Sequence, residues 1–588
     1  MRQVSGALLR SVWQTCSGRV MSSACSSPWW LGCSLIVASL FALDGLHAAF
    51  QSPYTVHNDA RQHVFWMQRF LDPALFPGDL IAEYFQSVAP FGYAMLYKLF
   101  AALGLDPFVV NKILPGILGV LATLYCFQLC TAIFPVPFAG FLSTLLLNQN
   151  LWLRDDLASG TPRAFLYPLL LAFLYYVLRG ALLPCLATLV LQGLFYPQTV
   201  FLSVALLCLR LLRCTLASGK MSQPACDYRL YGASLGTALV VLGLYALKNS
   251  DFGPVISASV ARNWPEFSAQ GRSAFFVPNA WVYWLYAERS GFFPSEWQYV
   301  LLFGFGCVLP LLQRSPIRFP LTTRIRRDRA LMLVELLLAS LGMFIIAHLC
   351  LFTLHLPSRY TQHSWRIIMA IANAMVLVIV LQAASTWITQ QLRTFFRVKK
   401  RLVTLVISSM VVALVLAPSY AVRAYPYRLG YVRGEAPSLY AFLRQQPKDT
   451  LVASLTKEAD FIPSLAQRSV VVAEEYAIPY HTGYYGPFKQ RTSALLDAQY
   501  SENLAQVQDF IQRYGVDIWL LEKDTFTPEY VAQRPWLMQF QPAATQAIAR
   551  MQHGKTPTLS RLTSSCVVFA DEQLLALDAQ CIMAVRLD

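Results

Sequence analysis

Long apolar runs separated by short polar segments dominate the first 422 residues of the chain. Because about 20 consecutive apolar residues cross the hydrocarbon core of a bilayer as a helix, these runs predict an α-helical polytopic membrane protein with about 11 transmembrane helices. The predicted spans are 28–50, 107–134, 136–153, 164–179, 181–196, 197–213, 230–248, 298–313, 330–356, 366–390 and 402–422. The first run, of roughly 22 residues, is too long for the apolar core of a signal peptide, so we interpret it as an uncleaved span.

Two segments depart from this pattern. Residues 90–105 are shorter and amphipathic, which is typical of a helix lying at the membrane surface, within a first outer loop at 51–106. Residues 423–588 alternate short apolar strands with amphipathic helices. A helix between two strands indicates a parallel crossover, so this segment is predicted to be a soluble α/β domain. The predicted strands are 450–455, 469–473 and 515–521, and the predicted helices are 438–444 and 503–514.

The distribution of charge sets the expected topology. Residues 1–422 carry a net charge of +16, whereas residues 423–588 carry −1. With a cytoplasmic N-terminal tail at 1–27, the tail and the cytoplasmic loops of the transmembrane domain (28–422) together carry 19 basic and three acidic residues. This asymmetry satisfies the positive-inside rule, and an odd number of spans then places the C-terminal domain on the extracytoplasmic side.

Composition excludes several classes of function. The chain is 56% hydrophobic and 13% charged, with a mean hydropathy of +0.45, and its basic residues lie in short loops, so nucleic acid is not an expected partner. Asp44 and Glu335 are the only acids within predicted spans, which disfavours ion-coupled transport. The chain has no Walker A motif. Cys566 and Cys581 are the two cysteines of the soluble domain, and they could form a disulfide in an oxidising compartment.

The first outer loop contains the first candidate site residues. Asp59 and His63 lie one helical turn apart beside Trp66 and Phe70, which could form a polar site at the membrane surface with Asp59 as general base toward a hydroxyl. The alternative is that Asn58 or Asp59 only caps a helix. Asp79 follows a Pro-Gly turn and is a candidate acid or a helix cap.

Two later outer loops contain further candidates. In the loop 154–163, Asp155 and Asp156 could bind a divalent cation such as Mg²⁺ or Mn²⁺, because hard cations prefer carboxylate oxygens. Arg154 and Arg163 of the same loop could bind a phosphate. The alternative for this loop is helix capping and anchoring at the membrane interface.

The predicted loop 356–366 places Arg359 and Arg366 on the outer side, where positive charge is disfavoured. Anionic lipid headgroups or a lipid-linked phosphate would explain both arginines. The alternatives are snorkelling and pairing with the acidic loops. His363 has no partner visible in the sequence, and we interpret it as an interfacial residue.

This layout resembles the GT-C superfamily of integral membrane glycosyltransferases, which use polyprenyl-phosphate-linked sugars. The stretches SLYAFLRQQPKDTLVA (438–453) and YGVDIWLL (514–521) are similar to segments of the soluble domain in such proteins. The resemblance covers most of the chain through loose motifs. It implies that Asp59 is the acid of the first outer loop, although Asn58 breaks the acidic pair often found there, and this departure puts metal binding in that loop in doubt.

The resemblance also implies roles for the later loops. Asp155 or Asp156 would be the second acid, and Arg359 or Arg366 would contact the lipid phosphate, with Arg163 as a further charge. The expected function is sugar transfer from a polyprenyl-phosphate donor to an unknown acceptor, with inversion at the anomeric carbon. The alternatives are a non-catalytic scaffold or accessory subunit of envelope polysaccharide or lipid assembly, and a transporter or flippase. The expected location, among membrane lipids, is a bacterial cytoplasmic membrane.

Overall fold

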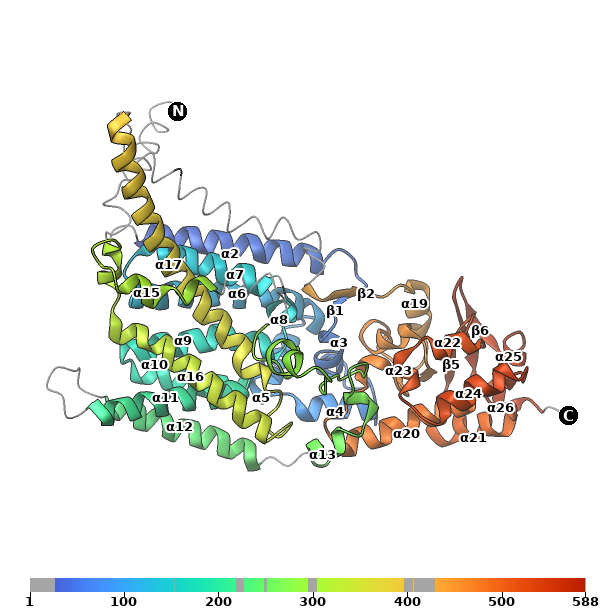
Figure 1. Ribbon diagram of the computed structural model, residues 1–588. Coiled ribbons are helices and arrows are strands. Elements are labelled where there is room, and N and C mark those ends of the chain that lie inside the picture. Colours follow the sequence, from blue (N-terminus) through green and yellow to red (C-terminus); the bar gives the residue numbers. More distant parts are fainter. Residues whose placement is uncertain are drawn as a thin grey trace.

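A computed structural model describes residues 27–152, 154–217, 227–247, 251–294, 304–395, 406 and 429–586. Helices whose axes are roughly aligned form a bundle, and the C-terminal domain lies at one end of that bundle (Figure 1). The first outer loop lies between the bundle and the domain (Figure 1). The predicted N-terminal tail at 1–26, residues 298–303 of the eighth predicted span, and all of the last predicted span except residue 406 lie outside the described residues.

The apolar runs form helices close to the predicted positions. Within the described ranges, six helices are long and apolar enough to cross a membrane: α2 (Ser27–Ala49), α6 (Pro107–Ile133), α11 (Gln198–Ala217), α12 (Tyr228–Leu247), α16 (Arg327–Leu349) and α17 (Ser358–Phe395). Shorter apolar helices lie among them: α7 (Pro137–Trp152), α9 (Leu166–Arg179), α10 (Leu182–Phe195) and α15 (Leu309–Gln313). The chain is therefore a helical polytopic membrane protein with a C-terminal α/β domain, while the number of 11 spans stays a prediction.

One boundary differs in a way that matters for the site. α17 begins at Ser358, directly after Pro357, so most of the predicted loop 356–366 is helical. Apolar periodicity missed these turns because their polar side chains are buried in the protein instead of exposed to lipid or water. The consequence is that Arg359, His363 and Arg366 have the helical spacing i, i+4, i+7 and share one face.

The first outer loop folds into short elements between α2 and α6. These are β1 (Thr55–His57), α3 (Ala60–His63), η2 (Phe65–Phe70), α4 (Leu80–Val88) and α5 (Phe91–Ala102). α5 buries Tyr93 and Tyr97, while Phe91, Leu99 and the following Leu103 are exposed on its other side. An exposed apolar face on this helix agrees with the predicted position at the membrane surface.

The C-terminal domain contains a five-stranded sheet with the order β4-β3-β5-β7-β6. β3 pairs in parallel with both β4 and β5, whereas β7 pairs antiparallel with β5 and β6. The three predicted strands are present as β3, β4 and β5; β6 and β7 were not predicted. The strands are β3 (Leu451–Ser454), β4 (Ser469–Val470), β5 (Ile518–Glu522), β6 (Val567–Ala570) and β7 (Leu574–Asp578), with helices α19 (Pro437–Gln445), α20 (Thr482–Gln499), α21 (Leu504–Tyr514), α22 (Pro528–Ala532), α23 (Pro535–Met538), α24 (Ala543–Gln552) and α26 (Ala579–Ala584).

Three kinds of contact join this domain to the first outer loop. β1 pairs antiparallel with β2 (Tyr431–Arg433), at the start of the domain. Arg61 forms a 2.7 Å ion pair with Glu475, and Lys448 forms a 2.5 Å ion pair with Asp72. A polar and partly buried joint of this kind holds the domain against the end of the bundle.

Candidate active site

Asp59 lies between β1 and α3. Figure 1 shows these two elements at the end of the bundle that faces the C-terminal domain. Asp59 occupies the N-cap position of α3, but its side chain makes no capping hydrogen bond. Instead, its carboxylate accepts a 2.8 Å hydrogen bond from the guanidinium of Arg163. Asn58 accepts from the guanidinium of Arg61. Helix capping therefore does not account for either side chain.

Arg163 connects Asp59 to a second carboxylate. Arg163 lies in the 3₁₀ helix η3 (Pro162–Phe165), and its other terminal nitrogen is 3.2 Å from the carboxylate of Asp156. Asp156 belongs to the one-turn helix α8 (Asp155–Ala158), and its side chain is only 2% exposed. The site therefore brings together an acid of the first outer loop and an acid of the loop predicted at 154–163.

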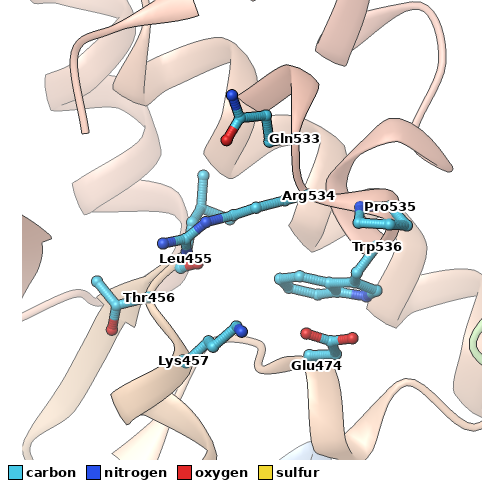
Figure 2. Close-up of a pocket in the computed structure, with 8 residues that line it drawn as sticks. All are labelled: Leu455, Thr456, Lys457, Glu474, Gln533, Arg534, Pro535 and Trp536. Carbon is cyan, nitrogen blue, oxygen red and sulfur yellow. Dashed lines mark hydrogen bonds between the residues drawn. The ribbon is translucent and has the colours of Figure 1, made fainter. Parts of the chain in front are cut away.

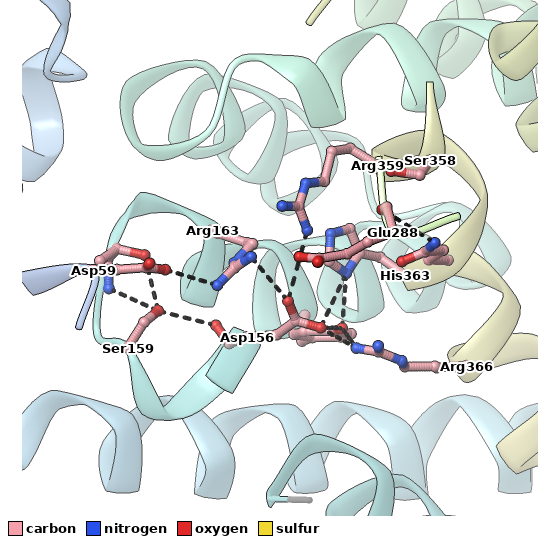
Figure 3. Close-up of polar contacts among 12 residues, drawn as sticks. Asp59, Asp156, Ser159, Arg163, Glu288, Ser358, Arg359, His363 and Arg366 are labelled. Atoms are coloured by element: carbon pink, nitrogen blue, oxygen red, sulfur yellow. Dashed lines mark hydrogen bonds and ion pairs between the residues drawn. The ribbon is translucent and has the colours of Figure 1, made fainter. Parts of the chain in front are cut away.

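The first turns of α17 complete the arrangement around Asp156 (Figure 3). Arg366 donates to the carboxylate of Asp156 and donates a 2.7 Å hydrogen bond to the hydroxyl of Tyr167. Arg359 is 3.9 Å from the same carboxylate, and the ring of His363 is 3.8 Å from it. Asp156 is thus held from one side by Arg163 and from the other by the buried face of α17.

Sequence reasoning missed two members of this network. His363 is buried, and its Nδ1 lies 2.8 Å from the hydroxyl of Tyr167, so the interpretation of His363 as an interfacial residue without a partner is wrong. The signal for His363 was its helical spacing from Arg359 and Arg366, which the predicted loop concealed. Tyr167 lies in the apolar run of α9, and no neighbouring polar residue marked it.

Cationic groups surround the two acids. Burial alone would raise the pKa of Asp59, but the charges of Arg163, His57 and His63 outweigh burial and lower it. Likewise, burial of Asp156 is outweighed by Arg366 and Arg163, which hold its pKa well below the usual range, with a smaller effect of Arg154. Four guanidinium groups (Arg154, Arg163, Arg359, Arg366) thus lie around these carboxylates, and Glu288 lies beside Arg359 (Figure 3). Guanidinium groups that converge in this way are typical of a site for an anionic ligand.

The same charges disfavour a divalent cation at Asp156. Its carboxylate is already contacted by Arg366 and Arg163, and a cation placed there would lie next to both guanidinium groups. The side chain of Asp155 lies outside the described part of the chain. Across the described residues, no group of three or more His, Cys, Asp or Glu side chains could hold a metal ion. The described contacts of Asp156 therefore disfavour Mg²⁺ or Mn²⁺ on this carboxylate, whereas the predicted site that includes Asp155 stays a prediction.

Two other predicted residues lie outside this network. The carboxylate of Asp79 accepts hydrogen bonds of 2.7 and 2.9 Å from the backbone amides of Ile81 and Ala82, which makes Asp79 the N-cap of α4. Capping was the alternative role predicted for Asp79, and it accounts for the geometry. The ring of His63 packs edge-on against Phe85, and burial lowers the pKa of His63 despite the opposing charge of Asp59.

Comparison with known proteins identifies the fold. No family model and no curated protein sequence matches this chain. Among solved structures, the chain is similar to the oligosaccharyltransferase AglB from Archaeoglobus fulgidus, determined with an inhibitory peptide and a dolichol-phosphate. The TM-score is 0.51 at 14% identity, over 88% of this chain and 72% of that one. ArnT from Cupriavidus metallidurans, bound to undecaprenyl phosphate, matches with a TM-score of 0.44 at 15% identity, over 94% and 98% of the two chains.

The similarity to AglB extends from the helical bundle into the C-terminal domain, because it covers most of the described chain. At this level of identity the similarity is one of fold. The resemblance to the GT-C superfamily inferred from the layout of spans and outer loops is thereby confirmed at the level of the fold, which this chain shares with the oligosaccharyltransferase AglB.

Proposed function

We propose that this protein is a membrane glycosyltransferase that moves a sugar from a polyprenyl-phosphate donor to an acceptor on the extracytoplasmic side. The observation that carries the proposal is the network in which Arg163 joins Asp59 to Asp156 beside Arg359 and Arg366. It supplies an ionised carboxylate next to several guanidinium groups. Burial of several charged groups costs free energy of desolvation, and a non-catalytic scaffold gains nothing from it.

The arginines have different surroundings and, in this proposal, different roles. The described ion pair of Arg359 is the long one of 3.9 Å to Asp156, and its side chain is 13% exposed. Arg359 is therefore the guanidinium best placed to contact a lipid phosphate. Arg366 is 2% exposed and already bonded to Asp156 and Tyr167, so it orients the buried acid.

Asp59 is the proposed general base. Its side chain is 29% exposed, compared with 2% for Asp156, so an acceptor hydroxyl can reach it. The hydroxyl transfers its proton to Asp59 as its oxygen forms a bond to the anomeric carbon. The bond from that carbon to the phosphate oxygen breaks, and its electron pair leaves with the lipid phosphate, whose charge Arg359 and Arg163 stabilise. Direct displacement inverts the anomeric configuration.

Two further observations support the lipid donor and the location. AglB, which has the same fold, was determined with a dolichol-phosphate. The positive-inside pattern, with +16 in residues 1–422, supports a position of Asp59 and the C-terminal domain on the side opposite the cytoplasm. The proposal includes the location of the protein in a bacterial cytoplasmic membrane.

The test uses the full chain in lipid nanodiscs. Release of undecaprenyl phosphate from a panel of undecaprenyl-phosphate sugars measures turnover, and Asp59→Asn should lower it by roughly 10²–10⁴-fold, the usual contribution of a general base. Asp509→Asn is the matched control, because Asp509 is a surface residue of α21 with a 66% exposed side chain. Undiminished turnover in Asp59→Asn would reject the proposed base.

A second measurement separates a scaffold from an enzyme. Binding of undecaprenyl phosphate should weaken by about tenfold or more in Arg359→Gln, because a charge-assisted contact to phosphate is lost. Arg513→Gln, which changes an exposed arginine of the soluble domain, should bind normally. A wild-type protein that shows neither binding nor turnover would indicate the scaffold alternative.

A further inference from the structure

A polar pocket lies in the C-terminal domain, apart from the network around Asp156 (Figure 2). Its volume is about 150 Å³. It opens where β3 ends, and the segment after β4 and the connection between α22 and α23 complete it. The residues that matter for its chemistry are Thr456, Lys457, Glu474, Gln533, Arg534 and Trp536.

The position of the pocket in the sheet is one where ligands bind in open α/β folds. β3 is followed along the chain by β4 on one side, while its other neighbour, β5, is reached only after a long crossover through α20 and α21. The chain therefore leaves the carboxyl ends of β3 and β5 in different directions. A crevice at such a topological switch point is a common binding site.

The charges of the described residues that line this pocket are balanced. Arg534 forms an ion pair with Glu522, donates a 3.2 Å hydrogen bond to the carbonyl of Leu455, and packs 3.7 Å from the ring centre of Tyr530. Lys457 and Glu474 then contribute one charge of each sign. With no surplus charge, the pocket has no preference for phosphate or for another ion.

The remaining groups suit a ligand that both donates and accepts hydrogen bonds. Among the described residues, the side chains of Lys457 and Glu474 have no hydrogen-bond partner, and Figure 2 shows both pointing toward the space beside Trp536. Trp536 is 5% exposed, and its indole N–H is buried without an acceptor. An aromatic face beside separate donors and acceptors matches a pyranose ring, which has C–H groups on its faces and hydroxyls around its edge.

We propose that this pocket binds one ring of a neutral saccharide. The C–H groups of the ring contact the part of Trp536 that lines the pocket, Glu474 accepts from its hydroxyls, and Lys457 donates to them. The volume admits a single ring, so the pocket recognises a terminal or branching unit of a longer glycan. This role does not depend on the proposed transferase activity, because the residues involved are outside the catalytic network.

The test is direct binding to the full chain in nanodiscs, labelled with 5-fluorotryptophan. Trp536→Phe identifies the fluorine resonance of Trp536 by its loss from the spectrum. The probes are the methyl glycosides of glucose, galactose, mannose and N-acetylglucosamine, with glucuronate and glucose 6-phosphate as charged counterparts. A saturable shift of the Trp536 resonance by at least one neutral glycoside is the expected result. A shift by the charged sugars alone, or by none of the probes, overturns the proposal.

Two variants of pocket residues test whether the glycoside binds in this pocket. Glu474→Gln and Lys457→Met should each weaken binding of the active glycoside by about tenfold, because each removes a charge-assisted hydrogen bond. Trp281→Phe is the matched aromatic control, since Trp281 is 75% exposed on the loop between α12 and α15. Asp59→Asn should bind the glycoside normally, even though we expect it to lower transfer. Binding that is insensitive to both pocket variants places the sugar elsewhere and refutes the site.

Discussion

Asp59 and Asp156 are joined by a single guanidinium group, yet they have opposite surroundings. Asp156 is enclosed by Arg163, Arg366 and the ring of His363, whereas the side chain of Asp59 contacts Arg163 and is 29% exposed. Enclosure fixes a side chain and deprives it of access to substrate, so a buried acid of this kind orients arginines. The accessible acid is the one available for proton transfer.

Substitution of the enclosed acid should therefore affect stability more than substitution of the accessible one. Asp156→Asn leaves the 2% exposed guanidinium of Arg366 without a counter-charge, which we expect to cost roughly 3–5 kcal/mol. Thermal unfolding of the full chain in nanodiscs measures this cost. Asp59→Asn is the comparison, and it should unfold close to the wild-type temperature. Equal melting temperatures for the two variants would contradict the assignment of roles.

The sequence indicated which residues were candidates, and the fold decides which of them meet. Asp59, Arg163, Asp156, Arg359 and Arg366 were predicted from charge on the outer side of the spans. Their convergence depends on the packing of α8, η3 and α17, which no local pattern encodes. Tyr167 and His363 could not be recognised because their significance comes only from contacts across that packing.

At the scale of elements, the ends of a helix were predicted well where the whole segment has the same apolar surroundings. The ends of α6 lie within one residue of the prediction, since lipid and protein interior select apolar residues throughout it. It failed at the start of α17, where buried polar residues imitate a loop, and at β6, where most side chains are exposed and no alternation is visible. Segments with mixed surroundings carry a weak periodic signal.

The last strands of the domain are held by a covalent link. A disulfide joins Cys566, next to β6, to Cys581 in α26, across 15 residues. Closing a loop of this length contributes about 3 kcal/mol by restricting the unfolded chain. The double variant Cys566→Ser/Cys581→Ser should therefore lower the free energy of unfolding of the domain by about that amount, measured in denaturant.

Thiol labelling supplies the independent check on that prediction. In protein purified without reductant, neither Cys566 nor Cys581 should react with a maleimide until a reductant is added. Ready labelling of both residues in untreated protein would contradict the disulfide, and with it the oxidising surroundings that it implies for this domain.

At the scale of the whole molecule, the joint between the domain and the first outer loop contains two acids around one arginine. Arg61 is 2.7 Å from Glu475 and 3.8 Å from Asp460, and Arg272 is 3.3 Å from Glu475. Burial, opposed by Arg61 and reinforced by Glu475, raises the pKa of Asp460 to about 7. The joint is therefore sensitive to pH in the neutral range.

The sign of that sensitivity follows from proton binding. A carboxyl group with a raised pKa binds more protons in the folded state than in the unfolded state, so its contribution is present at low pH and is lost as pH rises from about 4 to about 7. The slope is at most about 1.4 kcal/mol per pH unit. We expect docking of the domain to weaken as the pH rises from 5 to 7.5. Limited proteolysis measures this change, because a less tightly docked joint is cleaved faster.

Asp460→Asn provides the control for this pH dependence. The variant cannot ionise at this position, so its protection from protease should change less with pH than that of the wild type. A wild-type joint that tightens as pH rises would show that the ionised form of Asp460 is the stabilising one, contrary to the expectation.

The fold class was accessible from the sequence because it depends on the sum of many apolar positions. The place of the domain against the bundle was not, because it depends on a few contacts between distant segments, such as Arg61 with Glu475 and β1 with β2. Pairings across several hundred residues leave no trace in a local pattern. The candidate site lies beside this joint, so its geometry was inaccessible for the same reason.

The pairing of β1 with β2 has a consequence for anyone who exchanges parts between proteins of this fold. Asp59 follows the last residue of β1 by two positions, and the partner of β1 belongs to the chain leading into the C-terminal domain. A chimera that joins a foreign domain to this bundle before β2 would remove the strand that pairs with β1 and so disturb the position of Asp59. The two chains should therefore be joined after Arg433, so that β2 stays with the bundle and continues to hold β1 in place.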